Sequence, residues 1–140
     1  VNDLYLRGKK VGGILAEMRE GAVVIGIGIN LWPPVGGWPE ELREKAGALL
    51  LTPDENLRLS LIPRIAEGIL SLWQDGVPAP ELLTLYRSHS ILDGRTVEYS
   101  LDGHSHCGQV IGISDNFGLM LEEGGRTRVL TSGEVHITHF

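Results

Sequence analysis

The residues best suited to chemistry lie among the first 30 positions of this 140-residue chain. Lys10 stands just before Gly12 and Gly13, inside an otherwise apolar run. Glycine weakens a strand interior, so it is tolerated where a ligand or another backbone must approach closely. A lysine near a turn is usually solvated. The neighbouring glycines are therefore what favours a functional role for Lys10.

The second feature is a Gly-x-Gly-x-Asn motif within residues 23–31. The odd positions of this run are large and apolar, whereas Gly26, Gly28 and Asn30 occupy even positions. With a strand period of two, one face packs into a core and the other is nearly bare. The bare face is either packed against another backbone or the floor of a ligand site, and the motif alone favours neither. It is not a dinucleotide-binding fingerprint, because no helix follows the glycines.

Asn2 and Asp3 add polar groups at the start of the first predicted strand. On their own such residues commonly only cap a strand. Together with the ammonium of Lys10 and two strand faces cleared by glycine, they predict a flat pocket on an antiparallel sheet. Such a pocket suits a flat, uncharged ring system and a phosphate held by Lys10.

Three strands must position these residues, over 1–7, 11–18 and 23–31, with Gly8-Lys9 as a two-residue type II′ turn. Residues 32–39 form a loop on composition, and Pro39 then begins a short helix. The capping box Thr52-Pro53-Asp54-Glu55 predicts the start of a longer helix that ends at Gly76. Its apolar stripe recurs every four residues at Leu57, Leu61, Ile65, Ile69 and Trp73.

A further helix is predicted over residues 80–88. After residue 90 the pattern changes from helices to short strands. Turn signals at Asp102-Gly103, Asn116-Phe117-Gly118 and Gly124-Gly125 separate short strands. Residues 91–140 therefore predict a separate small β-barrel of about five strands, in the manner of SH3-like modules.

Composition excludes several classes of protein. The chain has 12 Lys+Arg and 18 Asp+Glu, a formal net charge of −6, which argues against broad non-specific binding of nucleic acid. No apolar run approaches the ~20 residues needed to cross a bilayer, and no signal peptide is visible. A single cysteine, Cys107, suits a reducing compartment. We therefore expect a cytoplasmic protein with no membrane partner.

One cluster in the second half has metal-ligand chemistry. His104 and His106 would share one face of a strand, next to Cys107. Two histidines at this spacing can bind a metal, but no third or fourth ligand is evident. The sequence favours a polar barrel surface here.

In their order, the motifs of the chain resemble those of the biotin protein ligases. That family carries Lys-Trp-Pro-Asn-Asp, Lys-x-x-Gly-Ile-Leu and Gly-x-Gly-x-Asn in the same order at similar spacing. Each motif is weak alone, whereas the series covers essentially the whole chain. The matching segments are Asn2-Asp3-Leu4-Tyr5, Lys9-Lys10-Val11-Gly12-Gly13-Ile14-Leu15-Ala16-Glu17, Gly26-Ile27-Gly28-Ile29-Asn30, Trp38-Pro39-Glu40-Glu41-Leu42 and Ser132-Gly133-Glu134-Val135.

The resemblance implies an α+β fold: part of a class II synthetase-like antiparallel sheet with helices, followed by a small SH3-like β-barrel. Residues 1–90 would be the C-terminal portion of the catalytic domain, and residues 91–140 the C-terminal barrel. Members of the family activate biotin with ATP, release pyrophosphate, and pass biotin from biotinyl-5′-AMP to a lysine of a carboxylase's biotin carboxyl carrier domain. Biotin, ATP and Mg²⁺ are the implied small molecules, and a homodimer is the implied assembly.

The resemblance also assigns roles to residues of this chain. Lys10 matches the essential lysine, which touches the biotin carboxyl region and the α-phosphate. Asp3 would contact Mg²⁺ through the nucleotide, and Trp38 would cover the purine from a loop that closes over the adenylate. The implied biotin site is Lys10, Gly12, Gly13, Gly26 and Gly28, and the implied nucleotide site is Asn2, Asp3, Asn30 and Trp38.

The chain departs from the family pattern at both ends. Only Val1 stands where the family has Lys-Trp-Pro before Asn2, and the upstream Gly-Arg-rich loop is missing. His136-Ile137-Thr138 stands where many members carry an arginine. We therefore expect the C-terminal half of a ligase, which needs the other half for activity and does not itself bind DNA.

Two other functions remain open. The chain could be a non-catalytic module that binds a carrier domain without forming adenylate. It could also be a relative of the lipoate ligases, which the Gly-x-Gly-x-Asn strand and the type of barrel disfavour.

Overall fold

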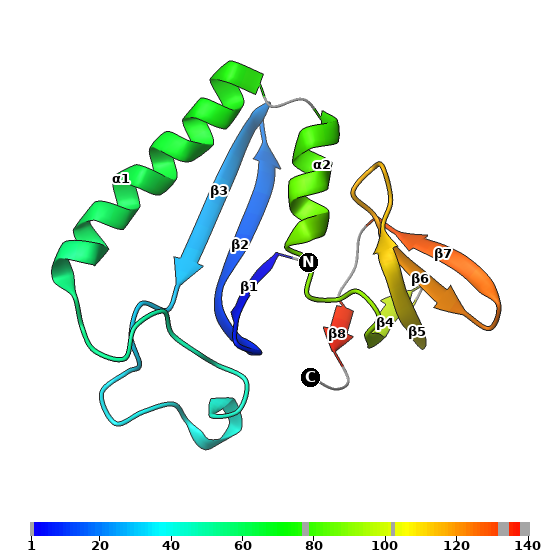
Figure 1. The fold of residues 1–140 in the computed structure, drawn as a ribbon, viewed down its shortest axis with the longest axis horizontal. Helices are drawn as coiled ribbons and strands as arrows, with labels where there is room; N and C mark the ends of the chain where they lie inside the picture. Colours follow the sequence, from blue (N-terminus) through cyan, green and yellow to red (C-terminus); the bar gives the residue numbers. More distant parts are fainter. Residues whose placement is uncertain (1, 77–78, 102, 132–134, 138–140) are drawn as a thin grey trace. The chain divides into compact units, whose positions relative to one another are not determined.

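The computed structural model describes residues 2–76, 79–101, 103–131 and 135–137 of the chain. It divides into two compact units, Val1–Leu70 and Ser71–Phe140, which we describe separately. Antiparallel sheets and helices make the fold α+β (Figure 1). Within the described residues, no helix has the length and apolar character needed to cross a membrane.

The first unit contains the sheet predicted from the N-terminal motifs. Strands β1 (Asp3–Leu6), β2 (Lys9–Arg19) and β3 (Ala22–Ile29) pair antiparallel in the order β1-β2-β3 (Figure 1). The three predicted strands are thus confirmed. The order places β2, which carries Lys10, between the other two.

The turn between β1 and β2 differs from the predicted one. Its central residues are Arg7 (φ 52°) and Gly8 (φ 78°), and Leu6 pairs with Lys9. Positive φ at both central positions defines a type I′ turn, so the predicted type II′ turn at Gly8-Lys9 is wrong by one residue. The glycine takes the second central position, and Lys9 becomes the first residue of β2.

After β3 the chain leaves the sheet and then returns to it. The predicted short helix is a 3₁₀ turn, η1 (Glu40–Leu42). Residues 45–50, which we call the strap, then run beside the start of β2, where Lys10 and Ala46 form a parallel bridge. The strap takes the place beside Lys10 that β3 leaves when it ends at Ile29.

The long helix α1 (Glu55–Ser71) begins later than predicted. Asp54 Oδ1 accepts a hydrogen bond from the N–H of Leu57 at 3.0 Å, so Asp54 caps the helix and Thr52 does not. The capping-box prediction is wrong by two residues, because aspartate caps as well as threonine and lies nearer the apolar stripe. Gly76 (φ 63°) ends the following π-helical segment η2 (Leu72–Gly76), as predicted.

The apolar stripe of α1 is half-buried along its length. This holds for Leu57, Leu61, Ile65 and Ile69. The last predicted member, Trp73, is 80% exposed and lies in η2. The four-residue spacing therefore correctly predicted the half-buried face of α1. It did not predict the exposure of Trp73, which lies in the π-helical segment η2.

The second unit begins with α2 (Ala79–Ser88), close to the predicted 80–88. Its five strands are β4 (Thr96–Leu101), β5 (His104–Ile113), β6 (Leu119–Glu123), β7 (Arg126–Leu130) and β8 (Val135–Ile137), all antiparallel in the order β7-β6-β5-β4-β8 (Figure 1). The five-strand prediction is confirmed, and an SH3-like closure of this sheet stays a prediction. The Ser132-Gly133-Glu134 segment, Thr138 and Asp102 lie outside the described residues.

The core of the second unit is formed by alternating residues of β4, β5 and β6. The buried members are Val97, Tyr99, Val110, Leu119 and Leu121. Gly124 and Gly125, both at positive φ, turn β6 into β7 as predicted. Arg87 of α2 donates a hydrogen bond from Nε to the carbonyl of Ile113 at 2.9 Å, which ties the helix to the sheet.

The boundary of the two units falls at residues 70/71, before α2. The predicted domains, 1–90 and 91–140, divide the chain after α2. As domain assignments they stay predictions.

Candidate functional site

The centre of the predicted site is an ion pair between neighbouring strands. Lys10 Nζ of β2 lies 2.7 Å from Asp3 Oδ1 of β1, and both side chains are nearly half-exposed. Tyr5, which pairs with Lys10 across the strands, lies close by. Burial raises the pKa of Tyr5 and the Asp3 carboxylate raises it further, so the phenol stays neutral beside the pair. The ammonium is therefore paired with a carboxylate and still open to a ligand.

Gly13 leaves the space that this ion pair occupies. A Cβ on Gly13 would lie 3.3 Å from Asp3 Oδ1 and 3.9 Å from Lys10 Cε. Gly13 pairs with Asp3 on one side and with Gly28 on the other, so these three residues share one face of the sheet. The face continues at Gly26, which pairs with Leu15.

The four glycines of the predicted biotin site serve different ends. A Cβ on Gly28 would meet nothing within 4 Å, and one on Gly26 would meet only Leu15 O at 3.8 Å. A Cβ on Gly12 would lie 2.5 Å from Gly28 O, which β3 brings close to β2 on the opposite face. Gly12 is thus required by backbone packing, whereas Gly13, Gly26 and Gly28 leave one face of the sheet open next to Lys10.

Asn30 lies at the end of β3 and points toward the strap. Its Nδ2 lies 3.0 Å from Gly47 O and 3.5 Å from Lys10 O. Its own N–H donates to Val11 O at 2.7 Å, and its carbonyl accepts from Leu49 N–H at 2.9 Å. The amide nitrogen of Asn30 is therefore engaged within the protein, which leaves Oδ1 for any nucleotide contact.

Two predicted nucleotide residues lie outside this cluster. Asn2 contributes its carbonyl, which accepts from Ile14 N–H at 2.8 Å, and its side chain is exposed. Trp38 is half-buried in the 32–39 loop, after Gly36 and Gly37 at positive φ. The structure thus brings together Asp3, Lys10 and the open glycine face, and among the described residues no side-chain hydrogen bond or ion pair joins Asn2 or Trp38 to them.

The strap is the part of the site that sequence reasoning missed. Lys9 Nζ donates to Arg43 O at 2.7 Å, and a Cβ on Gly47 would lie 2.8 Å from Lys9 Cβ. The sequence offers one signal of the strap, which is Gly47 followed by small and apolar residues. The bonds that hold the strap are mostly between backbone atoms, so no side-chain pattern marks them.

The histidines of the second unit form no cluster with metal-ligand geometry in the residues described. His106 Nδ1 lies 3.2 Å from Glu123 Oε1, and its ring stacks on Tyr99 at a centroid distance of 5.2 Å. Tyr99 donates to Glu123 Oε2 at 2.9 Å, and this bond, with that to His106, lowers the pKa of Glu123. Sequence reasoning did not single out Glu123.

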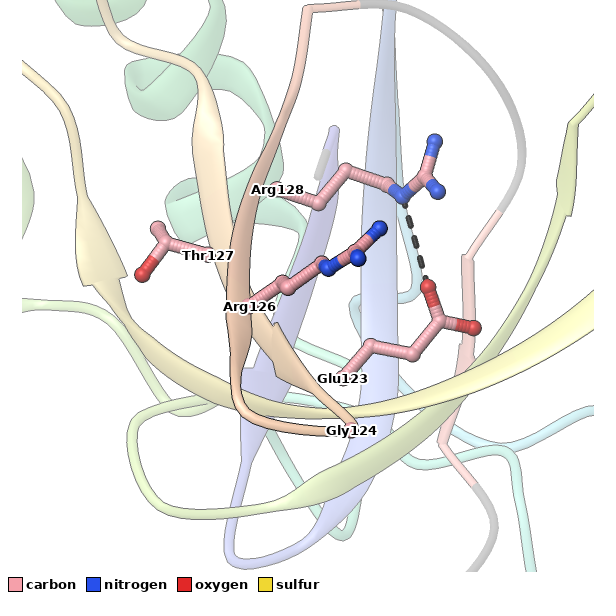
Figure 2. A pocket seen from close by; sticks show the side chains of 5 residues that line it. All are labelled: Glu123, Gly124, Arg126, Thr127 and Arg128. Atoms are coloured by element: carbon pink, nitrogen blue, oxygen red, sulfur yellow. Dashed lines mark ion pairs between the residues drawn. The ribbon is translucent and has the colours of Figure 1, made fainter.

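An open pocket of about 530 Å³ lies at the β6–β7 hairpin. Figure 2 shows Arg128 on β7 reaching back to Glu123, with Nε 3.4 Å from Oε2. The lining residues are Glu123, Gly124, Arg126, Thr127 and Arg128. The pocket belongs to the second unit, whereas Lys10 and the glycine face belong to the first.

The chain is similar in sequence to known ligases along nearly its whole length. It is 36% identical over 142 residues to the biotin–[acetyl-CoA-carboxylase] ligase of Mycobacterium tuberculosis, covering 96% of this chain and 50% of that protein. It is 27% identical over 144 residues to the bifunctional ligase/repressor BirA of Bacillus subtilis, covering 97% of this chain and 44% of the relative. The chain thus spans about half the length of the curated relatives it matches, and no family model matches it.

Solved structures show the same fold. The apo biotin protein ligase of Aquifex aeolicus superposes with a TM-score of 0.77 at 24% identity, over 99% of this chain and 63% of that one. A complex of that ligase with biotin and ATP gives a TM-score of 0.74 at 24% identity, over 99% and 60%. The sequence match covers 96% of this chain, and the solved ligase structures share its fold. The chain is therefore a homologue of the biotin protein ligases.

Proposed function

We propose that this chain carries the catalytic lysine of a biotin protein ligase, which biotinylates a carrier-protein lysine through biotinyl-5′-AMP. The observation that carries the proposal is the 36% identity to a biotin–[acetyl-CoA-carboxylase] ligase over 96% of this chain. Within the matched part, Lys10 is held at 2.7 Å by Asp3 beside an open glycine face. Because the chain matches only half of that relative, activity requires the other half of the ligase.

The first step is attack of the biotin carboxylate on the α-phosphorus of ATP. A carboxylate oxygen forms the new bond to phosphorus, and the bond to the bridging oxygen breaks, which releases pyrophosphate. Negative charge grows on the α-phosphate oxygens as the attack proceeds. The Lys10 ammonium, oriented by Asp3, compensates this charge.

The second step is transfer to the carrier. The neutral amine of the carrier lysine attacks the carbonyl carbon of biotinyl-5′-AMP, the bond to the phosphate oxygen breaks, and AMP leaves. The nitrogen gives up a proton to the solvent as the amide forms. Lys10 would again compensate the charge that the departing phosphate gains. The face at Gly13, Gly26 and Gly28 offers the flat ring system of biotin three positions without side chains, bordered by Leu15 opposite Gly26.

Mg²⁺ fits this site only together with the nucleotide. Magnesium is usually held by one or two carboxylates plus substrate phosphates, and Asp3 is the carboxylate that the described residues place beside Lys10. When bound, the ion would neutralise charge on the phosphates. Asp3 would hold it while still orienting Lys10.

We further propose a carboxylase's biotin carboxyl carrier domain as the protein partner, a homodimer as the assembly and the cytoplasm as the location. The Bacillus subtilis relative is named a ligase and a repressor. This chain carries a net charge of −6, so we assign it to the ligase reaction and not to DNA contact.

The test is reconstitution of the complete ligase. A chimera in which this chain replaces its matching half of the Mycobacterium tuberculosis ligase is incubated with biotin, ATP and a carrier domain. Pyrophosphate release and the mass of the carrier are followed. We expect both signals from the chimera and neither from the 140 residues alone.

The two alternatives give different results in the same assay. A non-catalytic module would bind the carrier domain but leave the chimera without pyrophosphate release. A lipoate ligase relative would modify the carrier when lipoate replaces biotin. Either result would contradict the proposed function.

A further inference from the structure

The peptide group of Lys10 is held on both sides by the strap. Lys10 N–H donates to Lys45 O at 2.8 Å, and Lys10 O accepts from Gly47 N–H at 2.8 Å. At this point β3 has already ended, so the strap replaces it as the neighbour of β2. The backbone of the lysine is therefore only as well fixed as the strap itself.

Asn30 joins the three segments that meet there. It is the residue after β3, its backbone pairs with Val11 of β2, and its carbonyl accepts from Leu49 of the strap. Its side-chain nitrogen lies 3.0 Å from Gly47 O and 3.5 Å from Lys10 O. Both neighbours are carbonyl oxygens, which only accept hydrogen bonds, so the NH₂ group of the amide must face them.

The ion pair with Asp3 does not fix the ammonium by itself. The Lys10 and Asp3 side chains are 47% and 40% exposed, and pairs exposed to this degree contribute little. A lysine side chain is also flexible along its four-carbon stem. The position of the ammonium therefore depends on the backbone from which it projects.

We propose that Asn30 is a positioning residue for Lys10, acting by tying the strap to the lysine's own carbonyl. This rests on the proposed function, in which Lys10 touches the α-phosphate. Asn30 Nδ2 bridges Gly47 O and Lys10 O, and so closes the clamp around the Lys10 peptide group. Any contact of Asn30 with the nucleotide is left to Oδ1, which can only accept.

Two variants separate positioning from nucleotide binding. Asn30→Asp and Asn30→Leu both lose the amide donors. Asn30→Leu also loses the acceptor oxygen, and Asn30→Asp alone adds a charge. In the chimera, both should lower the rate of pyrophosphate release at saturating biotin and ATP by roughly tenfold to a hundredfold, the scale of a small misplacement. The KM for ATP should change less than threefold in Asn30→Asp.

Arg19→Met is the matched control. It removes the exposed bonds from Arg19 to Glu17 at the far end of β2 and leaves the strap and the Lys10 clamp intact. We expect its rate to stay within twofold of the parent. Amide hydrogen exchange at Lys10 and Gly47 should become faster in both Asn30 variants and remain unchanged in Arg19→Met.

The outcomes distinguish this proposal from the proposed function. Loss of activity in Lys10→Ala together with normal rates in both Asn30 variants would overturn the positioning role and leave the function standing. A raised KM for ATP in Asn30→Leu alone, with normal Asn30→Asp, would make Asn30 a nucleotide contact and overturn it as well. Normal turnover in Lys10→Ala would overturn both. If Asn30→Leu fails to fold, Asn30→Asp and its exchange rates decide.

Discussion

Lys10 Nζ and Asp3 Oδ1 lie 2.7 Å apart on adjacent strands, with the Cβ-free position of Gly13 directly beside them. The three residues are separated by up to ten positions in the chain. Strand pairing aligns Asp3 and Gly13 in one row of the sheet, and the side chain of Lys10, which pairs with Tyr5, reaches this row. That row ends at Gly28, where the open face begins. The charged group that would act on a phosphate is thus next to a part of the sheet face where Gly13, Gly26 and Gly28 carry no side chains.

Lys10→Ala in the chimera should abolish adenylate formation while leaving the fold intact. A single preorganised charge at a transition state contributes ~3–4 kcal/mol, or roughly a hundredfold to a thousandfold in rate. The free energy of unfolding should change by less than ~1 kcal/mol, because the ion pair is exposed. Pyrophosphate release and thermal unfolding measure the two effects. Lys10→Arg should restore little of the rate, because the planar guanidinium does not fit a point-charge site.

Gly12→Ala and Gly28→Ala form a matched pair that separates packing from ligand binding. In Gly12→Ala the new Cβ would meet Gly28 O at 2.5 Å, so we expect a loss of ~1–3 kcal/mol in the free energy of unfolding. In Gly28→Ala the Cβ meets nothing, so stability should hold and the KM for biotin should rise. An unchanged KM for biotin in Gly28→Ala would show that biotin lies elsewhere.

Asp54→Ala should destabilise the first unit by ~1 kcal/mol, the usual cost of removing a helix cap. The reason is the 3.0 Å hydrogen bond from Leu57 N–H to Asp54 Oδ1. Thr52→Ala is the control, since Thr52 lies two residues before the cap, and it should leave the unfolding temperature unchanged. An equal loss in both variants would contradict the assignment of the cap.

The second unit should lose stability at both ends of the pH range. The hydrogen bond from Tyr99 lowers the pKa of Glu123 below its ordinary 4.5, so this stabilisation is present above pH 4.5 and lost as the pH falls through the lowered value. Burial raises the pKa of Tyr99 above 10.0, so its contribution is complete below pH 10.0 and lost as the pH rises further. Thermal unfolding against pH should show the acid loss flattened in Glu123→Gln and the alkaline loss flattened in Tyr99→Phe. If Glu123→Gln lost stability at acid pH as much as the parent does, the loss would be due to other carboxylates.

Much of the site could be predicted from the sequence because its residues belong to short motifs whose spacing reveals the strand and the face on which they lie. The alternation in residues 23–31 fixed which positions share a face, and the motif order placed Lys10, Asp3 and the glycines on neighbouring strands. The predicted positions of the β1–β2 turn and of the α1 cap were wrong by one and two residues, respectively. Arg7 adopts a positive φ, which is uncommon for arginine. Asp54 and Thr52 are both suitable N-cap residues, and Asp54 is the one that caps α1.

The strap could not be predicted for a different reason. Its contacts with Lys10 are backbone hydrogen bonds to Lys45 and Gly47, more than 30 positions away. Backbone groups are the same in every residue, so neither periodicity nor residue type marks such a pairing. The side chain of Asn30 was noticed as part of a ligand motif, whereas its partners in the structure are carbonyl groups of the protein.

Trp38 provides a last test of how the nucleotide is held. The 32–39 loop places Trp38 after Gly36 and Gly37, whose positive φ values let the chain reverse just before it. If the indole covers the purine, Trp38→Ala should remove a stacking contact of ~1–3 kcal/mol and raise the KM for ATP roughly fivefold or more. Trp73→Ala is the control, because Trp73 is 80% exposed and lies in η2. Protease cleavage within residues 32–39 should also slow when the chimera is saturated with biotinyl-5′-AMP. An unaltered cleavage rate, with a normal KM for ATP in Trp38→Ala, would show that this loop does not close over the adenylate.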